Sequence, residues 1–151
     1  MPDSKFTLDE LQQKFNIILT GNKGKFNNLP EVAPSQFILE ALDEYLPLAV
    51  AIGSEKARSE LIVAPILVAI KKHLNKQISL FSGIEFNVDI ELGLNSFGDF
   101  IISNSTQQFF IESPVIVLVE AKNNNLKSGL AQCMAEMVAA QIFNQRQDNE
   151  E

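Results

Sequence analysis

The sequence predicts an α/β or α+β protein in which helices cover both faces of a β-sheet. Apolar residues recur at helical spacing through much of the first half of the chain, and the period changes to two at Glu85–Leu92. A later run, Val115–Ala121, is rich in β-branched residues and leads into another helical pattern. This order packs as a helix–sheet–helix sandwich. With 151 residues, the chain is expected to form one domain.

Two helices are predicted before residue 50. Thr7 and Glu10 have the spacing of a capping box, so a short helix should follow Thr7. Ser35 is a suitable N-cap for a second helix over Gln36–Leu46, where apolar residues follow helical spacing. Pro47 should end that helix because proline lacks the N–H that the next turn needs.

A longer helix is predicted over Glu55–Leu74, starting after Ser54. It is apolar on more than one face, which indicates a largely buried helix. Pro65 lies inside it and predicts a kink or break near Leu61.

Strands are predicted in the second half of the chain. Glu85–Leu92 alternates apolar and polar residues, as a half-buried strand does, and Gly93–Phe97 should be a turn. A second strand is expected at Asp99–Ile102, and Phe109–Ile111 is a candidate extension of the sheet. Val115–Ala121 is apolar on both faces, which is typical of a central strand covered on both sides.

The last predicted helix is Leu126–Phe143, with Asn125 as its N-cap. We therefore divide the predicted domain into an N-terminal helical part at residues 1–53, a core at residues 54–144 and a polar tail at residues 145–151.

Composition restricts the classes of function. The formal net charge is −7, which argues against tight non-specific binding to nucleic acid but leaves room for an acidic site neutralised by a divalent cation. Cys133 is the single cysteine, so an internal disulfide and a cysteine zinc site are excluded. The N-terminal residues show no signal-peptide pattern, and the longest apolar run, Leu61–Ile70, is about half of a membrane span. We expect a cytoplasmic protein with no membrane partner.

Charged residues end the apolar run at 115–121. Period-two geometry puts Glu120 and Lys122 on one face of the strand and Ala121 on the other. If the strand of Asp99 pairs beside it, the Asp99 carboxylate can reach Glu120. Neighbouring carboxylates repel each other unless they share a proton or a cation, and oxygen ligands suit Mg²⁺ or Mn²⁺.

A metal site here would consist of Asp99, Glu120, the Ala121 carbonyl and waters. A water bound to the ion becomes a usable nucleophile near neutral pH, and Lys122 could orient it or stabilise charge on a phosphate. The alternative is an ordinary ion pair at a strand end, since the E-x-K pattern is common.

Asp99 and E-x-K, 21 residues apart, resemble the motif of the PD-(D/E)XK nuclease superfamily, whose fold is called restriction-endonuclease-like. The stretches SEKARSELIVAPIL, LNSFGDFIIS and PVIVLVEAKNNNLKSGLAQCMAEMVAAQIFN together look like a small bacterial, mostly cyanobacterial, branch of nuclease-like proteins. The resemblance covers Ser54–Asn144. It implies a central mixed sheet of three to five strands flanked by helices, and metal-dependent hydrolysis of phosphodiester bonds in nucleic acid, with DNA as the expected substrate.

The resemblance also implies further site residues. Glu60 matches a glutamate that often joins the metal site from the helix before the sheet, and Gln132 matches a polar residue that lines the site from the following helix. Gly98 replaces the motif's proline, which is a frequent variation.

Relatives of this type usually continue with further strands after the last helix, and many act as homodimers. We therefore expect an exposed sheet edge, a fragment of a longer chain, or completion by a partner chain.

Two functions remain open from the sequence. One is a Mg²⁺- or Mn²⁺-dependent nuclease that uses Asp99, Glu120, Lys122 and Gln132, with Glu60 as an additional metal ligand. The other is a non-catalytic interaction module, or degenerate nuclease, that has kept the fold.

Overall fold

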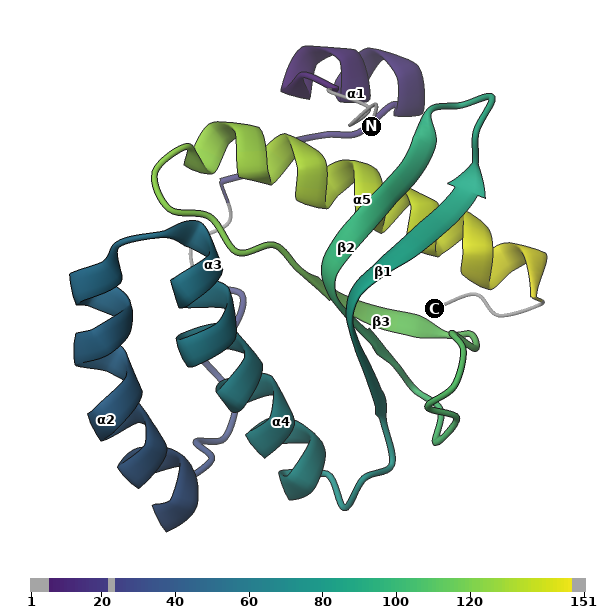
Figure 1. Ribbon diagram of the computed structural model, residues 1–151. Helices are drawn as coiled ribbons and strands as arrows, with labels where there is room; N and C mark the ends of the chain where they lie inside the picture. The colour runs from purple at the N-terminus through teal and green to yellow at the C-terminus, as the bar shows by residue number, and fades with distance from the viewer. Residues whose placement is uncertain (1–5, 22–23, 148–151) are drawn as a thin grey trace.

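The computed structural model describes residues 6–21 and 24–147, which form helices around a three-stranded sheet (Figure 1). The elements in chain order are α1 (Leu8–Phe15), α2 (Gln36–Ile52), α3 (Glu55–Arg58), the π-helical segment η1 (Ser59–Val63), α4 (Ala64–His73), β1 (Ser79–Asp89), β2 (Leu94–Ser103), β3 (Val115–Val119) and α5 (Leu126–Arg146). None of the helices in the described part of the chain has the length and apolar character that crossing a membrane requires.

The sheet is antiparallel throughout, in the order β1–β2–β3. This confirms a sheet flanked by helices, but the expected mixed sheet is wrong for the described residues. The central position predicted for Val115–Ala121 is also wrong, because β3 ends at Val119 and is an outer strand of the described sheet. Ile116 on β3 is 46% exposed. A β-branched run identifies a strand without showing how many neighbours it has.

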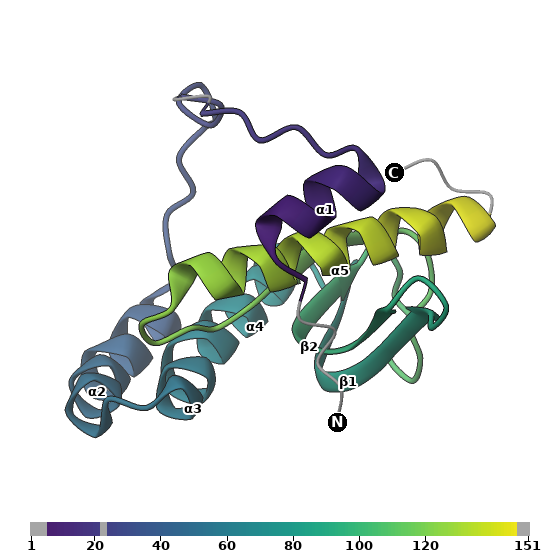
Figure 2. The ribbon, with the colours of Figure 1, turned by 90° about the horizontal axis from the view of Figure 1, so that it is seen from above.

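The helices form layers on both faces of the sheet. Helix α5 crosses one face, and α1 lies on the outer side of α5 (Figure 2). Helix α4 covers part of the other face, where α2 packs against η1 and α4. The predicted helix–sheet–helix arrangement is therefore present, with a further helix outside each inner one.

Strand β2 divides the core between the two inner helical layers. Ile101 packs in a cluster with small residues of α5, whereas Phe100 and Ile102 pack with Leu67 of α4. Alternation along the strand gives Asp99 the same face as Ile101. The Asp99 side chain therefore points to the α5 side of the sheet.

The predicted helix starts are confirmed. The backbone N–H of Glu10 donates to Thr7 Oγ1 over 3.3 Å, and the Thr7 N–H donates to Glu10 Oε2 over 2.7 Å, which completes the capping box. At the start of α5, the N–H of Ser128 donates to Asn125 Oδ1. Each cap satisfies a backbone donor that the helix itself leaves unpaired.

The two prolines in the helical region have different effects. The prediction that Pro47 ends its helix is wrong, because α2 continues to Gly53, which takes φ +70° and caps it. Ala49, beyond the proline, is fully buried, and this packing holds the last turns in place. Near Leu61, where Pro65 predicted a kink or a break, the chain stays helical but changes from α to π geometry at η1, which joins α3 directly to α4.

The boundary between the first two strands is displaced from its predicted place. Strand β1 starts before Glu85–Leu92 and ends at Asp89, whose Oδ1 accepts a hydrogen bond from the Leu92 N–H. Gly93, at φ +77°, closes the turn, and β2 begins immediately after it. The predicted turn Gly93–Phe97 is therefore wrong, because the Asp89 side chain and Gly93 place the reversal earlier.

Two other predicted segments also differ. Phe109–Ile111 does not extend the sheet, and Phe109 is 95% exposed. The predicted polar tail at residues 145–151 begins inside α5, which runs to Arg146, and residues 148–151 lie outside the described residues.

A side-chain carboxamide binds the backbone of each outer strand. On β3, Asn144 accepts from the Val115 N–H over 2.8 Å and donates to the Val115 carbonyl over 2.9 Å. On β1, Gln108 accepts from the Leu80 N–H over 3.1 Å and donates to the Leu80 carbonyl over 2.6 Å. Each carboxamide occupies hydrogen-bonding positions that a neighbouring strand would otherwise use.

Candidate functional site

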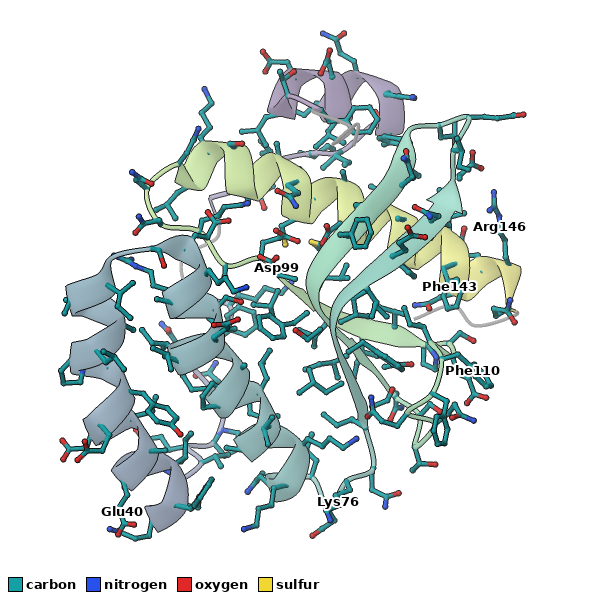
Figure 3. All side chains as sticks on the ribbon, in the orientation of Figure 1. Glu40, Lys76, Asp99, Phe110, Phe143 and Arg146 are labelled. Carbon is teal, nitrogen blue, oxygen red and sulfur yellow. The ribbon has the colours of Figure 1, made fainter. Side chains whose placement is uncertain are left out.

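Asp99 and Glu120 lie side by side across β2 and β3. Phe100 pairs with Val119, so the register continued by one residue sets Asp99 opposite Glu120. The Asp99 N–H donates to Glu120 Oε1 over 3.4 Å, and the Ala121 N–H donates to Asp99 Oδ2 over 2.8 Å. The two carboxylates share the sheet face toward α5, and Figure 3 shows Asp99 among the sheet, α5 and α3. The structure thus brings together the pair that the strand pattern predicted.

Helix α5 adds a third acidic residue, Glu136, to this pair. Glu136 is 2% exposed, and both of its carboxylate oxygens are buried without a hydrogen-bond partner in the described structure. Oε2 of Glu120 is also buried without a hydrogen-bond partner in the described structure, and the Glu120 side chain is 3% exposed. Sequence reasoning did not assign Glu136 to the site. The available signal was a glutamate set among small and apolar residues, Met134–Ala140.

Burial and mutual repulsion shift the acidity of these carboxyl groups. Burial raises the pKa of Glu120 from 4.5 to about 9, and the Glu136 and Asp99 carboxylates add to the rise, while the Asp99 N–H opposes it. Burial is also the main cause that raises the pKa of Glu136; nearby Glu120, Ser96 and Gln132 side chains oppose it. Without a cation, the pair of Glu120 and Glu136 therefore holds a proton at neutral pH.

Burial and the two glutamates also raise the pKa of the Cys133 thiol. The Cys133 side chain therefore lines the site as a neutral thiol and does not provide a thiolate nucleophile.

Lys122 carries the positive charge next to these acids. Its Nζ lies 3.8 Å from Glu120 Oε2 and 3.6 Å from Glu55 Oε1, so it links the end of β3 to α3. Its stem passes directly over α5 at Gly129, where an added Cβ would lie 2.5 Å from Lys122 Cγ. The glycine allows the close approach that sets the position of the ammonium group.

Replacing Gly129 with alanine should therefore give opposite results in two backgrounds. In the wild-type chain, we expect a destabilisation of about 1–2 kcal/mol, because the new methyl group displaces Lys122. In a Lys122→Ala background, the same change should stabilise by up to about 1 kcal/mol, since alanine favours helix over glycine. Urea denaturation of the four proteins measures the cycle, and an equal effect in both backgrounds would contradict the contact.

Glu60 and Gln132 occupy different surroundings. The Glu60 side chain is 62% exposed and pairs with Lys56 on the same helical segment, so the structure does not bring it to the carboxylates. Glu55 contacts Lys122 instead. Gln132 lies one turn before Glu136 on α5 and is close enough to lower its pKa, so the structure does bring it to the site.

Two cavities adjoin the acidic residues. One, of about 520 Å³, lies between η1 and α5, and its lining includes Arg58, Glu120 and Lys122. The Arg58 Nε is buried and has no hydrogen-bond partner within the described residues. The other, of about 530 Å³, is lined by residues that include Lys122, Gln132 and Glu136. Lys122 lines both cavities, whereas Glu120 lines the first and Glu136 the second.

The site has the donor chemistry of a hard divalent cation. Asp99 and Glu120 provide carboxylate oxygens, and Glu120 Oε2 is a buried oxygen in need of a partner. As they stand, no three His, Cys, Asp or Glu side chains of residues 6–21 and 24–147 are grouped to hold a metal ion. Binding would therefore require side-chain rotations that draw the carboxylates together.

Comparisons with protein-family models, with curated proteins and with solved structures gave no match to this chain.

Proposed function

We propose that the protein is a Mg²⁺- or Mn²⁺-dependent phosphodiesterase that acts on nucleic acid, with DNA as the substrate class. The observation that carries the proposal is the contact between Asp99 on β2 and Glu120, which directly follows β3, with Lys122 close to Glu120. This is the spatial arrangement that the resemblance to PD-(D/E)XK nucleases requires, and it arises from segments far apart in the sequence.

Each residue has a defined part in the proposed reaction. Asp99 and Glu120 would hold the cation, which when bound lowers the pKa of a coordinated water and offsets phosphate charge. Lys122 would orient the attacking water or stabilise the developing charge through its ammonium group. Arg58, with an unpaired buried N–H in the adjoining cavity, is suited to bind a phosphate oxygen. Gln132 would line the site from α5.

Cleavage assays test this proposal. Wild-type protein with Mn²⁺ should cut at least one form in a panel of single-stranded, double-stranded and branched DNA and RNA, and EDTA should stop it. The variants Lys122→Ala and Asp99→Asn should lose about 100-fold or more of the rate, because each removes a group needed in the transition state. Lys72→Ala, on the exposed last turn of α4, is the matched control and should cut normally. Equal, background-level cleavage by wild type and Lys122→Ala would count against the proposal.

A non-catalytic interaction module is the second candidate, and the surface of α2 favours it. Large apolar side chains are exposed along this helix, which is unusual for a free surface. They are Phe37, Leu39, Leu46, Leu48, Val50 and Ile52. A partner protein or a second copy of the chain would cover them. Inactive protein that fails to bind Mn²⁺ but associates through α2 would favour this candidate.

A further inference from the structure

Glu136 is a buried carboxyl group whose charge, when it ionises, no hydrogen bond within the described structure balances. Its two oxygens have no hydrogen-bond partner in the described structure, although leaving such a group unpaired costs several kcal/mol. Asp99 and Glu120 are close enough for their carboxylates to interact with it. Carboxylates this close repel one another unless they share a proton or a cation binds between them.

The charges of the cluster specify what would bind. Asp99, Glu120 and Glu136 contribute three negative charges when ionised, and Lys122 contributes one positive charge at 3.8 Å from Glu120. Glu55 also approaches Lys122, but its side chain is half exposed, so its charge is solvated. Arg58 lines the same cavity as Glu120 and Lys122, and its charge offsets a further part of the cluster. The charge that remains when all three acids are ionised is negative, and a bound cation would balance it.

We infer that Glu136 is a third carboxylate ligand of the divalent cation, so that helix α5 completes a site that β2 and β3 begin. This inference rests on the proposed metal-dependent function and extends it to a residue outside the D…E-x-K pattern. Three carboxylates with waters in the remaining positions suit Mg²⁺ or Mn²⁺. The ion would fasten α5 to the sheet, because its ligands come from both layers.

The structure also decides between Glu136 and Glu60 as the third carboxylate. Glu60 is exposed and already paired with Lys56, so moving it to the site would break that pair and bury its charge. Glu136 is already buried against the other two acids. Binding through Glu136 requires only rotation of side chains that face one another.

Isothermal titration of the full chain with Mn²⁺ tests the inference. We expect Glu136→Gln and Asp99→Asn each to weaken Mn²⁺ binding about tenfold or more. Glu136→Asp keeps the charge but has a shorter side chain, so its affinity for Mn²⁺ should lie between those of Glu136→Gln and wild type. Glu60→Gln and the exposed control Glu85→Gln should bind as wild type does. Thermal melts in EDTA check folding, and Glu136→Gln should melt at or above the wild-type temperature because it removes a buried charge.

The outcomes separate this inference from the function on which it rests. Loss of Mn²⁺ binding in Asp99→Asn with unchanged binding in Glu136→Gln would overturn the role of Glu136 and leave the metal site standing. Weakened Mn²⁺ binding in Glu60→Gln alone would mean that Glu60 of η1, and not Glu136, is the third carboxylate ligand. A wild-type protein that does not bind Mn²⁺ or Mg²⁺ would overturn the proposed function and this inference together.

Discussion

In EDTA at pH 8, the Glu120→Gln variant should be more stable than the wild-type protein by about 2 kcal/mol, and the difference should shrink toward pH 5. Glutamine has nearly the shape of a protonated glutamate and keeps the oxygen that accepts from the Asp99 N–H. It carries no charge at any pH. The variant therefore avoids the cost that wild type meets at pH 8, where Glu120 must take up a proton when it folds in beside Asp99 and Glu136.

The direction follows from the two protonation equilibria of Glu120. Its carboxyl has a pKa near 4.5 in the unfolded chain and about 9 in the folded protein. Between these values the folded protein binds the extra proton, so stability falls as pH rises. The contribution is complete below pH 4.5 and is lost as pH passes through about 9. The site adjoins two open cavities, and screening by solvent reduces the effect to the order of 2 kcal/mol.

Thermal melts from pH 5 to pH 9 measure this effect. Wild type should lose melting temperature across the range more steeply than Glu120→Gln, and the surface control Glu85→Gln should follow wild type. Adding Mn²⁺ at pH 8 should stabilise wild type more than Glu120→Gln, since the variant has lost a ligand. Parallel pH profiles for Glu120→Gln and wild type in EDTA would show that Glu120 does not carry the buried proton.

Replacing Asn144 with alanine should destabilise the protein by about 3 kcal/mol. The side chain is 1% exposed, and its carboxamide makes both hydrogen bonds to the Val115 backbone. Removing it leaves a buried N–H and a buried carbonyl without these partners, each at a cost of about 1–3 kcal/mol. A small cavity between α5 and β3 adds to the loss.

Urea denaturation measures the effect, with Gln145→Ala as the matched control. Gln145 is the next residue on α5 and is exposed, so its replacement should change stability by less than about 0.5 kcal/mol. A loss below about 1 kcal/mol for Asn144→Ala would mean that water replaces the carboxamide at this edge.

The geometry of the site could be predicted from the sequence where it depends on local rules. Period-two alternation predicted that Glu120 and Lys122 lie close together, and their side chains do, although β3 ends before both of them. The contact of Asp99 with Glu120 was expected only if their segments paired, and the pairing of β2 with β3 provides it. Glu136 could not be placed in this way. Helix α5 carries small or apolar residues on most of its surface, so its pattern does not show which face meets the sheet. Only the packed structure shows that Glu136 points inward.

The fold, too, could be predicted where it depends on local sequence features. Capping residues predicted the starts of α1 and α5, and Pro65 predicted an irregularity where the π-helical segment η1 lies. The order of strands and the outer position of β3 depend on long-range pairing, which no local pattern contains. Pro47 inside α2 shows that burial of a later residue can outweigh one lost backbone hydrogen bond.

The carboxamides of Gln108 and Asn144 also affect how the molecules associate with one another. A strand from another molecule that added to β1 or β3 at Leu80 or Val115 would have to displace an amide that already satisfies both backbone groups. Extension of the sheet into fibrils is therefore obstructed at one position on each side. At high protein concentration, the molecules should associate first through the exposed apolar side chains of α2. They should form reversible oligomers in preference to cross-β aggregates.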